Sequence, residues 1–283
     1  MAFVYAKKQI GGVKIMIYDL QKASMWKRIS AFLCDMISFC IVAVGIAFLL
    51  SSLSGIDTQQ SKMVETCDRY AEEYGLDAFL TKEELDGAIT FSVTEERYNA
   101  LTDAQKEIYQ KATEALSADQ EYLQAYYLVN QLILLVITFS ILISCLLLEF
   151  VVPLLFKNGQ TLGKKVFGVG VMRMDGVKIS PVILLVRTLL GKYAVETMIP
   201  VFVLLSILFG SASIVTLILL LLLAVAQIAL LIFTQANTPL HDMLAGTVTV
   251  DFASQMIFDS PEELLEYKKK IHAESVVEKT QHS

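Results

Sequence analysis

Charged side chains set within apolar sequence are the residues of this chain with the clearest capacity for chemistry. Arg28 and Asp35 are seven positions apart at the start of a long apolar run. On a helix they would share one face, at levels about 10 Å apart. An ionised carboxylate inside a bilayer is costly unless it is paired or hydrated, and it otherwise takes up a proton. Asp35 is therefore either a group that responds to protons or cations, or a packing acid hydrogen-bonded to a neighbouring helix.

A second acid, Asp242, lies in a Leu-His-Asp-Met-Leu-Ala-Gly-Thr segment just after the last apolar run. Arg28 is within reach at this position, so we expect the two residues to pair. The neighbouring His241 has no second histidine or cysteine at ligand spacing, which disfavours a zinc site or a Ser-His-Asp triad. We therefore expect no enzyme activity, no catalytic residue, no metal and no cofactor. Secondary polar candidates, all set in or beside the apolar runs, are Glu149, Glu196 and Gln227.

The elements that must hold these side chains are apolar stretches of the length that crosses a membrane. The chain of 283 residues is 55% hydrophobic and only 18% charged, and its apolar residues occur in blocks. About 20 apolar residues suffice to cross roughly 30 Å of hydrocarbon. We expect four membrane-spanning helices, at residues 29–53, 126–149, 191–210 and 213–234.

The distribution of lysine and arginine predicts the orientation of these helices. Six basic residues precede the first span, and seven lie from the end of the second span to Lys192 at the start of the third. Residues 54–125, by contrast, hold six basic and sixteen acidic residues. A multi-pass protein of the cell membrane with both termini in the cytoplasm places every basic segment inside. The net charge of −6 combines the acidic segment 54–125 with the basic segments beside the spans. We expect the bilayer, and not a nucleic acid, as the partner.

Two of the segments between spans carry structure of their own. The acidic segment 54–125 is expected to be a helical extracellular insertion, since Thr102 and Gln105 have the spacing of a capping box. It is a candidate docking surface for an extracellular protein. In the cytoplasmic segment 150–190, Val166–Arg173 and Val177–Ser180 flank Asp175-Gly176, which predicts a β-hairpin.

The flanks of the spans complete the predicted arrangement. Residues 181–190 are expected to form a helix in the membrane interface, where basic side chains contact anionic lipid. Residues 1–28 and 235–283 are the cytoplasmic terminal segments. In the second of these, Ser260-Pro261 is a helix start, because serine caps a helix and proline suits its first position.

Taken together, these features resemble the RDD family of membrane proteins, which is named for one arginine and two aspartates. The resemblance is carried by Arg28, Asp35, the Gly-Gln-Thr-Leu-Gly-Lys-Lys segment at 159–165 and the late His-Asp motif. It implies that Arg28, Asp35 and Asp242 are the signature residues, and that transport of an unidentified ligand, including cation/proton exchange, is a candidate function. The long segment 54–125 departs from the compact family pattern.

The predicted fold is thus an all-α polytopic membrane protein with four spans, a helical insertion and a small β-hairpin collar. Two functions stay open. The first is a transporter of a small ligand or of cations and protons, which needs self-association because four helices rarely enclose a pathway alone. The second is a non-enzymatic scaffold or assembly factor in which Arg28, Asp35 and Asp242 only hold the helices together.

Overall fold

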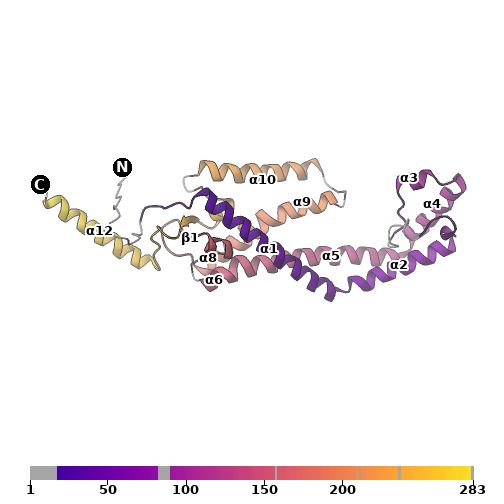
Figure 1. The fold of residues 1–283 in the computed structure, drawn as a ribbon, viewed down its shortest axis with the longest axis horizontal. Coiled ribbons are helices and arrows are strands. Elements are labelled where there is room, and N and C mark those ends of the chain that lie inside the picture. Colours follow the sequence, from indigo (N-terminus) through magenta and orange to yellow (C-terminus); the bar gives the residue numbers. More distant parts are fainter. Residues whose placement is uncertain are drawn as a thin grey trace. The chain divides into compact units, whose positions relative to one another are not determined.

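A computed structural model describes residues 18–81, 90–156, 158–208, 210–211, 213–234 and 237–281. Residues 1–17 of the predicted N-terminal segment lie outside them. The chain divides into two compact units, Met1–Val42 with Leu142–Ser283, and Ala43–Ile141. Both are mainly helical, and a single two-stranded sheet occurs in the described part of the chain. The predicted all-α fold with a small sheet is confirmed (Figure 1).

Within the described ranges, four apolar helices are long enough to cross a membrane. They are Met25–Ser54, Gln120–Phe156, Pro181–Leu208 and Ile214–Phe233. The first is α1 and the last is α10, and each is a single α-helix. The second comprises α5 (Gln120–Leu146), the π-helix η3 (Leu147–Val151) and α6 (Val152–Phe156). The third comprises α8 (Pro181–Val186), the π-helix η4 (Arg187–Met198) and α9 (Ile199–Leu208).

The third span differs from the prediction of an interfacial helix at 181–190 followed by a span at 191–210. One uninterrupted helical segment begins at Pro181, where the Ser180 hydroxyl accepts a hydrogen bond from Ile183 N. Arg187 made residues 181–190 look interfacial, but its side chain is fully buried in the protein. A buried, paired arginine does not require contact with lipid headgroups, so the helix continues. After a short connection, α10 returns alongside α9 (Figure 1).

The sheet pairs two strands that are distant in sequence. Strand β1 (Val169–Arg173) runs antiparallel to β2 (Thr247–Asp251), with Val171 opposite Thr249. The predicted hairpin partner, Val177–Ser180, contributes a bridge between Met172 and Lys178 instead of a full strand. Ser180 already caps α8, so this arm is too short to complete a ladder.

Short helices surround the sheet in the same unit. They are α7 (Leu162–Val166), capped by the Thr161 hydroxyl, and α11 (Leu240–Leu244). The C-terminal helix α12 (Pro261–Gln281) begins as predicted, with Glu263 N donating to Ser260 Oγ. Phe258 and Leu264 pack against Val177 and join this helix to the sheet region.

The second unit contains the predicted helical insertion. Its elements are α2 (Ile56–Glu73), the 3-10 helix η1 (Leu76–Ala78), α3 (Glu95–Asn99) and α4 (Asp103–Ala118). The capping box of Thr102 and Gln105 at the start of α4 is confirmed. Apolar side chains of α2, α4 and α5, including Met63, Ala112 and Val129, form one core.

Candidate functional site

Asp35 joins the first span to the segment that follows the second. Its carboxylate accepts hydrogen bonds from the Thr161 hydroxyl at 2.5 Å and from Gly163 N at 2.7 Å. Both donors belong to the first turn of α7, where a carboxylate is favoured by unpaired N–H groups. The contact is close because residue 163 is glycine, since a Cβ there would lie 2.2 Å from the Ala31 carbonyl oxygen. Asp35 therefore fixes α7 against α1.

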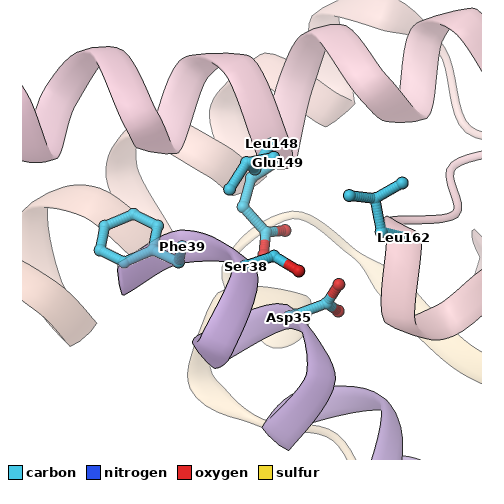
Figure 2. A pocket seen from close by; sticks show the side chains of 6 residues that line it. All are labelled: Asp35, Ser38, Phe39, Leu148, Glu149 and Leu162. Carbon is cyan, nitrogen blue, oxygen red and sulfur yellow. The ribbon is translucent and has the colours of Figure 1, made fainter. Parts of the chain in front are cut away.

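A small cavity of about 10 Å³ lies beside this contact, between α1, η3 and α7. Its volume is close to the lower limit for one water molecule. It is lined by Asp35, Ser38, Phe39, Leu148, Glu149 and Leu162. Figure 2 shows the oxygens of Asp35, Ser38 and Glu149 turned toward the same space. Two acids from different spans therefore face one cavity of the size of a water molecule or a small ion.

Glu149 lies in the π-helix η3 and is held by the third span. Its Oε1 forms an ion pair with Lys192 Nζ at 2.5 Å, and its backbone carbonyl accepts a hydrogen bond from the Thr188 hydroxyl. The other carboxylate oxygen, Oε2, is buried and has no hydrogen-bond partner among the described residues. Lys192 and Thr188 belong to the π-helix η4. Such segments are rare and occur frequently at functional sites.

Asp242 forms a fully buried ion pair. Its Oδ1 lies 2.7 Å from Arg187 Nε, and both side chains are 0% exposed. The hydroxyls of Thr247 and Thr249 donate to the same carboxylate at 2.8 and 2.9 Å. Burial opposes its ionisation, but the attraction and hydrogen bond of Arg187, together with electrostatic interactions with His241 and Lys164, outweigh burial and hold the pKa of Asp242 well below its usual range.

Arg28 does not take the place predicted for it beside Asp242. Its guanidinium donates to the backbone carbonyls of Asn237 at 2.7 Å and Thr249 at 2.6 Å, while Arg187 takes the carboxylate. Arg28 and Asp242 still attract each other through space. The arginine therefore clamps the start of α1 to the segment around β2, and the direct pair is formed by a residue of the third span.

The secondary candidates Glu196 and Gln227 meet at His241. Glu196 accepts hydrogen bonds from His241 Nδ1 at 2.7 Å and from Gln227 Nε2 at 2.6 Å. Burial lowers the pKa of His241, so the imidazole is neutral at pH 7 and donates from Nδ1 to the carboxylate. Gln227 also accepts from Leu240 N. This cluster fixes α11 between the third and fourth spans.

Reasoning from the sequence missed three basic side chains that act on the candidate acids. Arg187 pairs with Asp242, Lys192 pairs with Glu149, and Lys164 is buried and interacts electrostatically with Asp35 and Glu149. A lone arginine in the apolar run Pro181–Leu190 was the available signal for Arg187. Lys164 carried none, because it is followed by Lys165 in a segment that looks solvent-exposed.

One of three comparisons with known proteins gives a match. The model of the RDD family matches residues 22–246, which include Arg28, Asp35 and Asp242. A search of curated proteins and a search of solved structures each return no match. The match covers most of the chain and ends between α11 and β2. The chain therefore belongs to the RDD family of membrane proteins.

Proposed function

We propose that this protein exchanges a small cation for protons across the cell membrane, with Asp35 and Glu149 as the site where the two alternate. The observation that carries the proposal is the orientation of both carboxylates toward one cavity (Figure 2). The two acids come from the first and second spans. A carboxylate pair in such a place is stabilised by a proton, a cation or water.

The free oxygen of Glu149 supports the same proposal. Oε2 is buried without a hydrogen-bond partner among the described residues, although Oε1 is paired with Lys192. A buried acceptor without a partner raises the free energy of the folded protein until a donor or a cation reaches it. Ser38 is a third side chain of the cavity wall that carries an oxygen, in its hydroxyl group. The donor set is therefore entirely of oxygen, the type that small hard cations prefer.

The orientation in the membrane is part of the proposal. The basic segments before the first span and between the second and third spans favour the cytoplasmic side, with both termini there. The acidic segment 54–125 would then face the exterior, where it is available to a partner protein. Because four spans enclose little space, exchange requires association of at least two copies.

A scaffold without transport is the second candidate, and a specific observation favours it. Both oxygens of Asp35 are engaged by α7, through Thr161 and Gly163. Asp242 is likewise fully engaged, by Arg187 and two threonines. These contacts hold the helices together whether or not an ion passes. The two functions predict different results when a cavity acid is replaced by its uncharged amide of the same shape. Exchange requires the charge, whereas a scaffold requires only that the helices stay together.

The test is ion exchange by the purified full chain in liposomes that enclose a pH-sensitive dye. Addition of Na⁺ or K⁺ outside should move protons, and Glu149→Gln should abolish this flux while the protein remains folded. Glu107→Gln is the matched control, since Glu107 is exposed and its ion pair is with Lys111 in α4. Absence of cation-driven proton flux in the unaltered protein refutes exchange of these ions and leaves the scaffold as the better account.

A further inference from the structure

We infer that Lys192 cancels one of the two acidic charges at the cavity, so that the protein takes small monovalent cations and exchanges each of them for one proton. This inference rests on the proposed function and names its substrate class. Lys192 does not line the cavity, and it acts through Glu149, to which its ammonium group is bound. It is therefore a residue that determines specificity and not a ligand.

The contact between Lys192 and Glu149 is direct and shielded from solvent. Lys192 Nζ lies 2.5 Å from Glu149 Oε1, and the two side chains are 17% and 11% exposed. An ion pair with so little access to water is screened much less than a pair at the surface. The ammonium group therefore balances the charge of this carboxylate.

A second contact from the same π-helix fixes the place of Lys192. The hydroxyl of Thr188, four positions earlier in η4, donates to the backbone carbonyl of Glu149 at 2.9 Å. Thr188 is fully buried. The third span thus binds both the backbone and the side chain of Glu149, which keeps the ammonium group on the Oε1 side of the carboxylate.

Glu149 divides its two oxygens between the lysine and the cavity. Oε1 is bound by Lys192, whereas Oε2 is buried and has no hydrogen-bond partner among the described residues. Figure 2 shows the carboxylate of Glu149 turned toward the space that Asp35 and Ser38 also face. The pairing with Lys192 therefore leaves Glu149 an oxygen for a cation while its charge is already balanced.

Asp35 supplies the charge that is not balanced. Its two hydrogen-bond donors, the Thr161 hydroxyl and Gly163 N, are neutral groups. Two carboxylates and one ammonium group thus leave one negative charge at the cavity. One proton or one monovalent cation neutralises this charge. A divalent cation would leave an unpaired positive charge in a cavity of about 10 Å³, which is costly in a buried place.

Two further cations act on Glu149 through space, namely Lys164 and Arg187. Arg187 is balanced by its own carboxylate, Asp242, at 2.7 Å. Lys164 is the same in every variant compared below. A change of cation preference between these variants therefore reports on Lys192.

The experiment compares the unaltered full chain with Lys192→Met in liposomes that enclose a pH-sensitive dye. In the unaltered protein, Na⁺ or K⁺ should move protons, and Ca²⁺ should inhibit this flux weakly. Lys192→Met leaves two unbalanced carboxylates, so the Ca²⁺ concentration that halves the Na⁺-driven flux should fall about tenfold or more, because added ligand charge favours Ca²⁺. Lys178→Met is the matched control and should not change it, since the ion pair of Lys178 is with the exposed Asp259.

A double variant separates the charge of Lys192 from its contribution to packing. Glu149→Gln alone leaves Lys192 and Asp35 to cancel each other, so Na⁺ should move no protons. Adding Lys192→Met restores one negative charge while glutamine keeps an oxygen at the cavity, so the double variant should again respond to Na⁺ and resist Ca²⁺. Replacing both partners of a buried ion pair is often nearly neutral for stability, so this variant serves where Lys192→Met does not fold. A double variant that folds but does not respond to Na⁺ contradicts the inference.

The possible outcomes separate this inference from the proposed function. If the unaltered protein exchanges Na⁺ for protons and Lys192→Met has the same sensitivity to Ca²⁺, the inference is refuted and the proposed function stands. The same holds if Ca²⁺ drives protons through the unaltered protein as well as Na⁺ does. If the unaltered protein moves no protons in response to Na⁺ or K⁺, both are refuted.

A measurement on the unaltered protein gives a second test. Exchange of one monovalent cation for one proton moves no net charge across the membrane. Na⁺-driven proton flux should therefore produce no signal from a dye that reports membrane potential. A potential that develops together with the proton flux contradicts the inference and leaves the exchange itself in place.

Discussion

Loss of one partner of the Arg187–Asp242 pair should destabilise the protein strongly, and loss of both should not. The two side chains are fully buried and 2.7 Å apart. Removing one partner of a buried ion pair costs about 3–5 kcal/mol, whereas replacing both by apolar groups is often nearly neutral. Asp242→Asn leaves a buried guanidinium whose two amino groups already have no hydrogen-bond partner among the described residues. We therefore expect this variant to lie at the upper end of that range.

Unfolding of the purified protein in detergent, followed with temperature and denaturant, measures these differences. A cycle of Asp242→Leu, Arg187→Met and the double variant should give a coupling free energy of at least about 2 kcal/mol. The control is the cycle for Arg173 and Asp175, which are 2.6 Å apart but exposed. That pair should give less than about 1 kcal/mol. A coupling at the buried pair no larger than at the exposed pair refutes the reasoning from burial.

Two further predictions concern α7. Gly163→Ala places a methyl group 2.2 Å from the Ala31 carbonyl oxygen and should lower stability by about 1–3 kcal/mol. Gly45→Ala is the control, because nothing lies within 4 Å of a Cβ there, and it should not lower stability. Equal melting temperatures of the two variants contradict the close packing at Gly163. Burial and repulsion lower the pKa of Lys164 from 10.5 to about 7, so the folded protein binds fewer protons than the unfolded chain between these values. Stability should therefore rise from pH 7 to pH 9, by about 1 kcal/mol per unit, and Lys164→Met should remove this rise in the melting temperature.

The sequence was sufficient to predict the features that depend on local pattern. The apolar runs of α1 and α10 identified two spans, because length and composition alone decide whether a helix can cross a bilayer. The capping box at Thr102 was also predictable, because its two residues are only three positions apart in the sequence. Asp35 was singled out as a group that needs partners, because an intramembrane acid is expensive wherever it lies, and its carboxylate accepts two hydrogen bonds.

The partners themselves were not predictable, because they are distant in sequence. Asp35 is bound 126 and 128 residues away, at Thr161 and Gly163. Arg28 and Arg187 are both basic and both reach toward the same region, and only the packing of η4 against α11 decides which one takes Asp242. The continuous helical segment from Pro181 was not predicted, because a buried arginine and an interfacial arginine look alike in sequence.

The central claim, that Asp35 and Glu149 form one site for a cation or a proton, is tested most directly by infrared difference spectroscopy. Spectra of the purified protein with and without Na⁺ or K⁺ report changes in carboxylate bands. The account predicts a difference signal that is partly lost in Asp35→Asn, partly lost in Glu149→Gln, and unchanged in Glu107→Gln. No carboxylate signal on addition of either ion between pH 6 and pH 9, or a signal that persists in both cavity variants, contradicts it.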